Sequence, residues 1–157
     1  MRSAIRKVQP QDVDSLKVVI DTNGLFPSGM LEEMMEGYFT NPLSKDIWLT
    51  QEVNNVPIAV AYCAPERLTD GTFNLYLIAV HKDHQGLGIG AEIMAYLENL
   101  LKANRVRILL VETSGLPEFE LTRKFYDKCN YNREAVIRDF YREGEDKVVF
   151  WKKLSYH

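Results

Sequence analysis

The stretch Phe73–Gly90 constrains the fold of this chain more than any other. Its first part, FNLYLIAV from Phe73 to Val80, is so apolar that it predicts a strand in the middle of a sheet. Its second part, HQGLGIG from His84 to Gly90, places three glycines directly before a helical pattern. That pattern has its apolar positions at Ile89, Ile93, Leu97, Leu100 and Leu101. The sequence therefore predicts a strand, a glycine-rich loop and a long amphipathic helix in direct succession.

A glycine-rich loop at the start of a helix is suited to binding a phosphate group. The first four amides of a helix have no partner within the helix, and the helix dipole adds partial positive charge there. Glycines let this backbone approach a bulky anion without steric hindrance from Cβ atoms. The alternative is a turn that only permits a tight connection between strand and helix. The strand, the glycines and the helix together favour phosphate binding, and the lack of a Walker lysine excludes a P-loop.

The rest of the chain alternates between strand and helix patterns. Strands are predicted at Ala4–Val8, Ile47–Val53, Pro57–Ala64, Arg107–Val111, Ala135–Tyr141 and Lys147–Lys153. Helices are predicted from Pro10 to Asn23, over Met30–Phe39, and after Pro117 with Leu121, Phe125 and Tyr126. Early hairpins and one central βαβ unit indicate an α/β fold of the α+β type with a mixed sheet. No shift in composition marks an internal boundary, so one domain over residues 1–157 is expected.

Charge and cysteine usage narrow the class of protein. The net charge of −3 argues against a nucleic-acid partner. The two cysteines, Cys63 and Cys129, lack the spacing of a metal site and indicate reduced thiols in a cytoplasmic protein. No apolar run approaches the roughly 20 residues that span a bilayer, so no membrane partner is expected. His81 and His84 have no visible third ligand, so no metal is expected and both are predicted to be solvent-exposed.

A dinucleotide-binding fold competes for the same glycines. Gly86, Gly88 and Ala91 satisfy the pattern G-x-G-x-x-[GA], and Glu112 at the end of the next strand is placed to bind a ribose. However, five residues, His81–Gln85, separate the strand from the glycines. Only 45 residues follow Glu112, too few to complete a doubly wound sheet. A nicotinamide-dependent oxidoreductase is thus the least favoured interpretation.

The chain resembles the GCN5-related N-acetyltransferase (GNAT) family. The segment Gln85–Gly90 matches the family signature Q/R-x-x-G-x-G/A position by position, and Phe125–Tyr131 is similar to a second family element around a tyrosine. The order of the predicted elements also fits. The resemblance implies a mostly antiparallel sheet with a splayed pair of parallel strands and flanking helices.

The resemblance further implies acetyl-coenzyme A as the co-substrate, without a metal. The main chain of Ile78, Ala79 and Val80 would pair with the pantetheine arm, whose amide groups suit an open strand edge. The Tyr126 hydroxyl would lie near the coenzyme sulfur. The pyrophosphate would be held by the backbone amides of Gln85, Gly86, Leu87, Gly88, Ile89, Gly90 and Ala91.

Acetyl transfer to an amine requires proton transfers that particular residues can perform. Tyr126 is the candidate acid for the departing thiolate, and the alternative is a tyrosine of the core. Many family members carry a glutamate at the position that corresponds to Asn74, and an amide cannot accept the proton. Glu112 is therefore the candidate base, with water held near Asn74 and Tyr76 as the alternative. Glu112 could also be a solvated strand-end glutamate or an ion-pair partner of Arg107.

The sequence thus predicts an N-acetyltransferase in which a primary amine attacks the thioester directly within a ternary complex. The acceptor stays open between a small-molecule amine, an amino acid and a protein N-terminus. The C-terminal stretch IRDFYREGEDKVVFWKKL resembles the ribosomal-protein alanine acetyltransferases. A non-catalytic acyl-coenzyme A sensor with the same fold is the competing class. A homodimer and acyl chains longer than acetyl are also left open.

Overall fold

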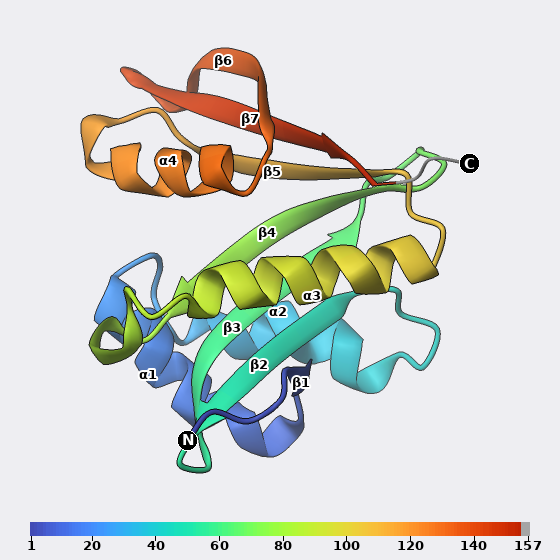
Figure 1. Ribbon diagram of the computed structural model, residues 1–157, viewed down its shortest axis with the longest axis vertical. Helices are drawn as coiled ribbons and strands as arrows, with labels where there is room; N and C mark the ends of the chain where they lie inside the picture. Colours follow the sequence, from blue (N-terminus) through green and yellow to red (C-terminus); the bar gives the residue numbers. More distant parts are fainter. Residues whose placement is uncertain (155–157) are drawn as a thin grey trace. The chain divides into compact units, whose positions relative to one another are not determined.

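The computed structural model describes residues 1–154, which form four α-helices and seven strands (Figure 1). The predicted order of strands and helices is confirmed. The last three residues of the expected domain, including His157, lie outside the described residues. The strands are β1 (Arg6–Lys7), β2 (Ile47–Val53), β3 (Val56–Pro65), β4 (Thr72–Val80), β5 (Ile108–Ser114), β6 (Asn132–Arg142) and β7 (Glu145–Lys153). The helices are α1 (Val13–Asn23), α2 (Met30–Thr40), α3 (Ile89–Ala103) and α4 (Glu120–Lys128), with short 3₁₀ turns η1 (Pro10–Asp12), η2 (Lys82–His84) and η3 (Pro117–Phe119).

The strands form a mixed sheet, as expected, in the order β1-β2-β3-β4-β5-β7-β6. The pairs β1/β2, β2/β3, β5/β7 and β6/β7 are antiparallel. Strands β4 and β5 are parallel, and their register joins Thr72–Leu75 to Ile108–Val111. That register stops at Leu75 and Val111, although β4 continues to Val80 and β5 to Ser114.

The chain divides into two compact units. The first contains Met1–Ala64 and Leu77–Tyr96, and the second contains Pro65–Tyr76 and Leu97–His157. Strand β4 and helix α3 contribute residues to both. No helix within residues 1–154 is long and apolar enough to cross a membrane.

The core of the first unit lies between α1, α2 and strands β2 to β4 (Figure 1). Apolar residues spaced three or four apart, such as Leu16, Val19 and Ile20 in α1, give each helix one buried face. Complete burial of such a side chain stabilises the fold by roughly 1.5–3 kcal/mol. The buried cluster consists of Val8, Leu16, Val19, Ile20, Leu31, Met35, Trp48, Val60, Leu77 and Ala79.

A three-residue ionic cluster attaches the N-terminal strand to the start of α1. The guanidinium of Arg6 in β1 donates to both carboxylate oxygens of Asp12, at 2.7 and 2.9 Å, and also binds Glu52 of β2. The Asp12 carboxylate, which is buried, accepts a further bond from the backbone N–H of Gln9 at 2.7 Å. The hydrogen bonds from Arg6 lower the pKa of Asp12 against the opposing effect of burial.

In the second unit, α4 runs alongside β5 and β7 (Figure 1). A buried polar network joins α3 to β7. The hydroxyl of Tyr131 donates to Glu98 of α3 at 2.7 Å, and the ammonium of Lys152 in β7 donates to the other oxygen of Glu98 at 2.9 Å. Lys152 also binds the carbonyl of Cys129 at 2.9 Å, just beyond α4. Burial raises the pKa of Tyr131, so its hydroxyl stays protonated and serves as a donor.

Candidate active site

The glycine loop between η2 and α3 adopts a backbone conformation that requires glycine at two positions. Gly86 has φ +79° and Gly88 has φ +82°, in the left-handed region that other residues rarely occupy. A Cβ atom built on either glycine would meet no heavy atom within 4 Å. The space beside both glycines is therefore open to a ligand.

The loop also presents unpaired backbone donors. The N–H of Glu92 is the first in α3 to form a helical bond, to the carbonyl of Gly88 at 3.1 Å. Among residues 1–154, no carbonyl accepts a bond from the amides of Gly86–Ala91. The amide of Gln85 differs, because it contacts the carbonyl of Lys82 at 3.5 Å. Six of the seven amides expected to bind phosphate are thus unpaired and lie at the positive end of a helix of 15 residues.

The Gln85 side chain fixes this loop in place. Its Nε2 donates to the side-chain oxygen of Asn23, the last residue of α1, and to the carbonyl of Val80, both at 3.1 Å. The Asn23 side chain donates to the same Val80 carbonyl at 3.0 Å. Both lone pairs of the Val80 oxygen are therefore already used inside the protein. The expected pairing of pantetheine with the main chain of Ile78, Ala79 and Val80 stays a prediction, although the Val80 carbonyl is already bound within the protein.

A cation that the sequence did not indicate lies against the loop. Arg2 donates from Nη1 to the carbonyl of Leu87 at 3.3 Å and forms an ion pair with Glu92 of α3 at 2.9 Å. The side chain of Leu87 is exposed. Arg2 is far from the loop in the sequence, so no local pattern could have identified this contact.

The candidate acid, Tyr126, lies on the buried face of α4. Its ring packs against Phe150 of β7 at 5.3 Å between centroids and against Phe125 and Tyr131. The side chain is 4% exposed, and this burial raises the pKa of its hydroxyl above the usual value. Within residues 1–154, the hydroxyl forms no hydrogen bond. Tyr126 thus has the packing of a core residue together with an unused polar group.

The candidate base, Glu112, has a cationic partner. Its Oε1 lies 3.0 Å from Nζ of Lys147 in β7, which in turn lies over the ring of Phe140 at 3.7 Å. The alternative partner considered from the sequence, Arg107, instead donates to the carbonyl of Asp70 at 2.6 Å. The Glu112 carboxylate therefore belongs to an ion pair between neighbouring strands, and its role as a base stays a prediction.

A second carboxylate lies beside Asn74, the position discussed above for the base. Oε1 of Glu66, just after β3, accepts hydrogen bonds from the side chains of Asn74 and Tyr76 in β4. Sequence reasoning identified Asn74 and Tyr76 but missed Glu66. Glu66 follows the last residue of β3, in the connection to β4, and no residue pattern marked it.

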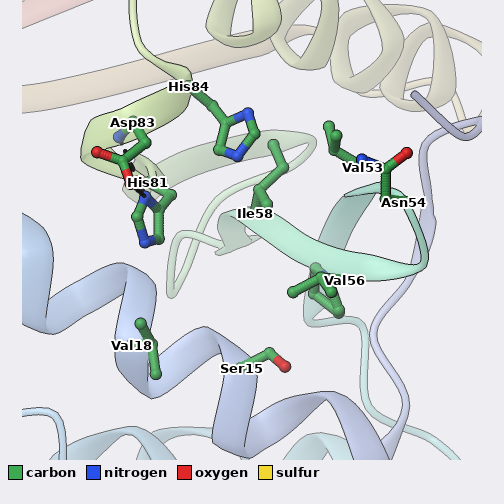
Figure 2. A pocket seen from close by; sticks show the side chains of 10 residues that line it. Ser15, Val18, Val53, Asn54, Val56, Ile58, His81, Asp83 and His84 are labelled. Carbon is green, nitrogen blue, oxygen red and sulfur yellow. Dashed lines mark hydrogen bonds and ion pairs between the residues drawn. The ribbon is translucent and has the colours of Figure 1, made fainter. Parts of the chain in front are cut away.

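The histidines before the loop line a separate hollow of about 360 Å³ (Figure 2). Its walls come from α1, from the turn between β2 and β3, and from His81, Asp83 and His84. The expectation that both histidines are solvent-exposed is wrong, because each is half-buried in this wall. His81 accepts a bond from the amide of Asp83 at 3.1 Å through Nδ1. Within the described part of the chain, no three His, Cys, Asp or Glu side chains form a group suited to a metal ion.

The chain belongs to the GNAT acetyltransferase family. The family model described as "Acetyltransferase (GNAT) domain" matches residues 44–133, which include β2 to β5, the glycine loop and α4. The family assignment made from the Gln85–Gly90 signature is thereby confirmed.

Comparison with individual proteins supports the same assignment. An uncharacterized N-acetyltransferase of Methanocaldococcus jannaschii is 31% identical over 87 residues, which cover 53% of this chain and 53% of the relative. The match thus spans about half the length of that curated relative. A GNAT-family protein from Desulfovibrio desulfuricans has a TM-score of 0.92 at 28% identity over 99% of this chain and 100% of its own. The structure of yncA from Salmonella typhimurium with its cofactor acetyl-CoA has a TM-score of 0.77 at 15% identity, over 98% and 95%.

Proposed function

We propose that this protein is an N-acetyltransferase that moves an acetyl group from acetyl-coenzyme A to a primary amine. The observation that carries the proposal is the set of six unpaired amides from Gly86 to Ala91, beside two glycines with open space around them. Such a loop suits a pyrophosphate, because backbone N–H groups and the helix dipole both favour an anion there.

Two further observations support acetyl-coenzyme A as the phosphate-containing ligand. The chain belongs to an acetyltransferase family, and yncA, which has the same fold, was solved with acetyl-CoA. Main-chain groups of Ile78 and Ala79 in β4 directly precede the loop and would pair with the pantetheine amides. Arg2 donates to the carbonyl of Leu87 and forms an ion pair with Glu92, so it helps to hold the loop against the start of α3.

The chemistry that we propose is direct attack of the amine on the thioester in a ternary complex. Direct attack requires no covalent intermediate on the protein and therefore no reactive thiol. Burial raises the pKa of both Cys63 and Cys129, as in unreactive cysteines. Tyr126 donates its proton to the departing thiolate. Its raised pKa keeps the hydroxyl protonated until that step.

The acceptor in this proposal is a primary amine, because an alkylamine becomes a nucleophile on losing one proton. Small-molecule amines, free amino acids and protein N-terminal amines all satisfy this requirement. The protein must therefore supply a proton acceptor near the amine, and its two candidate carboxylates are Glu112 and Glu66.

Two measurements test this function. Coenzyme A and acetyl-coenzyme A should raise the melting temperature, whereas NAD and NADP should not. A panel of the three amine classes is then assayed with acetyl-coenzyme A, and the released thiol is measured. Stabilisation without thiol release on any amine would instead identify an acyl-coenzyme A sensor. Stabilisation by a nicotinamide nucleotide alone would contradict the assignment of the loop.

A further inference from the structure

Glu66, Asn74 and Tyr76 form a polar cluster within the second unit. Glu66 follows the last residue of β3, and the other two residues are separated by one position on β4, so they share a face of the strand. The side-chain Nδ2 of Asn74 donates to Oε1 of Glu66 at 3.3 Å, and the Tyr76 hydroxyl donates to the same oxygen. A half-buried carboxylate is thus fixed in place by two donors.

The cluster contains two acceptors without donors. Asn74 is 1% exposed, yet its Oδ1 has no hydrogen-bond partner. The bond from Nδ2 to the Glu66 carboxylate sets the orientation of the amide, so the unpaired atom is the oxygen. Oε2 of Glu66 also receives no hydrogen bond from residues 1–154. Buried acceptors normally find a donor, so the unpaired Asn74 oxygen, beside a half-buried carboxylate, indicates a ligand with N–H or O–H groups.

The carboxylate of Glu66 differs from that of Glu112 in its charge environment. Glu112 is paired with the mostly buried ammonium of Lys147 at 3.0 Å. Glu66 forms no ion pair within residues 1–154. A carboxylate that is already paired with a fixed cation attracts a second cation less strongly. The ammonium of an acceptor should therefore bind more favourably to Glu66 than to Glu112.

Hydrogen bonds of the Glu66 backbone hold the local fold, which therefore does not depend on the Glu66 carboxylate. The N–H of Glu66 donates to the carbonyl of Thr72 at 2.8 Å, and its carbonyl accepts from the Thr69 hydroxyl at 2.9 Å. These bonds close the connection from β3 to β4. The side chain is therefore free to serve the ligand.

We propose that Glu66 is the general base for acetyl transfer and that the oxygen of Asn74 helps to orient the acceptor amine. This inference rests on the proposed function and adds its proton acceptor. The ammonium donates to Glu66 and to Asn74 Oδ1, and Glu66 takes one proton to leave a neutral amine. The nitrogen lone pair forms the C–N bond to the thioester carbon while the C=O π electrons move onto oxygen, and the nitrogen then loses a second proton to solvent. The C=O bond re-forms as the C–S bond breaks with its electrons remaining on sulfur. Tyr126 protonates the thiolate and regains a proton from solvent, and Glu66 releases its proton to solvent.

The test compares Glu66→Gln with the wild type under saturating acetyl-coenzyme A, across acidic to alkaline pH. Glu66→Gln should lower kcat/KM for the amine by roughly 10²–10⁴-fold at neutral pH. It should also remove the acid limb of the pH profile, with recovery at alkaline pH where more free amine is present. The rise in melting temperature with coenzyme A should not change. The control is Glu118→Gln, which makes the same substitution at an exposed position in η3 and should leave all three measurements unchanged.

Two further variants separate a chemical role of Glu66 from a structural one. Glu66→Gln combined with Asn74→Asp returns a carboxylate to the cluster and should restore the acid limb and part of the rate. Glu66→Asp keeps the charge and should retain the acid limb at a lower rate, even if Glu66→Gln folds poorly. A wild-type acid limb in Glu66→Gln, or no rescue in the double variant, overturns the proposal. Failure of the proposed function is distinct, because the wild type would then transfer acetyl to no amine.

Discussion

Nζ of Lys147 lies 3.0 Å from Oε1 of Glu112, and this ion pair joins β7 to β5 with little exposure of the lysine. Glu112→Gln should lower the free energy of unfolding by about 1–3 kcal/mol, because it leaves a mostly buried ammonium without a counter-charge. It should leave the acid limb of the pH–rate profile in place. Chemical unfolding and a pH–rate profile on the same preparation check both points. Loss of the acid limb in this variant would identify Glu112 as the base and contradict the assignment to Glu66.

The lysine provides a control for the same pair. Lys147→Met should by itself lower the free energy of unfolding. The double variant, Glu112→Gln with Lys147→Met, should lose less free energy of unfolding than the sum of the losses in the two single variants. This non-additivity measures the coupling between the two side chains. Additive effects would show that the two charges do not interact.

Gly88→Asp should weaken coenzyme A binding at least tenfold while the protein stays folded. It places a carboxylate next to the amides expected to bind the pyrophosphate, and its Cβ would meet no protein atom within 4 Å. Calorimetric titration with coenzyme A measures the affinity. Gly24→Asp is the matched control, since Gly24 also has a left-handed backbone, with φ +63°, and open space around it. Equal affinities in the two variants would rule out the phosphate site.

Tyr126→Phe should lower turnover about 10- to 1000-fold and leave coenzyme A affinity unchanged, because only the proton donor is removed. Burial raises the pKa of Tyr126, so its hydroxyl should cause no loss of activity on the alkaline side near pH 10 or below. Single-turnover rates provide the measurement. Tyr131→Phe, which removes the bond to Glu98, should reduce stability more than turnover. Wild-type turnover in Tyr126→Phe would leave this residue with a packing role only.

Asp12→Asn should destabilise the protein by about 1–3 kcal/mol at neutral pH, because Arg6 loses a buried charged partner. The pKa of Asp12 is lowered in the folded state, chiefly by its hydrogen bonds from Arg6. Its stabilising effect is therefore complete above the unfolded-state pKa of about 3.9 and is lost as the pH falls through the folded-state value. Urea unfolding at neutral and acidic pH should show the wild type and the variant converging in acid. A constant difference across pH would exclude this charge effect.

Most of the fold could be predicted because local patterns determine it. The spacing of three to four residues between Val13, Leu16 and Ile20 identifies α1, and the apolar run in β4 identifies a central strand. Asn54 and Asn55 both adopt positive φ, at 51° and 66°, as a tight turn between β2 and β3 requires. These features depend on residues that are close in the sequence, so they can be recognised from the sequence alone.

The contacts around the candidate catalytic groups could not be predicted in the same way. The pairing of Glu112 with Lys147 depends on the register of β5 against β7, in which Glu112 lies opposite Val149. The approach of Glu66 to Asn74 depends on the course of the connection between β3 and β4. Neither distance follows from residue type or spacing. A shift of one residue would turn Glu112 to the other face of β5, and the path of the connection after β3 determines where Glu66 lies.

The hydrogen bonds of the Gln85 side chain bear on whether the glycine loop can be moved into another protein. A segment with the residues of β4, the loop and α3 would lack Asn23, which belongs to α1 and binds both Gln85 and Val80. Transplanted alone, its left-handed glycines would sample many conformations, and ligand binding would first have to order them. The loop therefore does not form a self-contained binding element, and a design that transfers it to another protein must also include the end of α1.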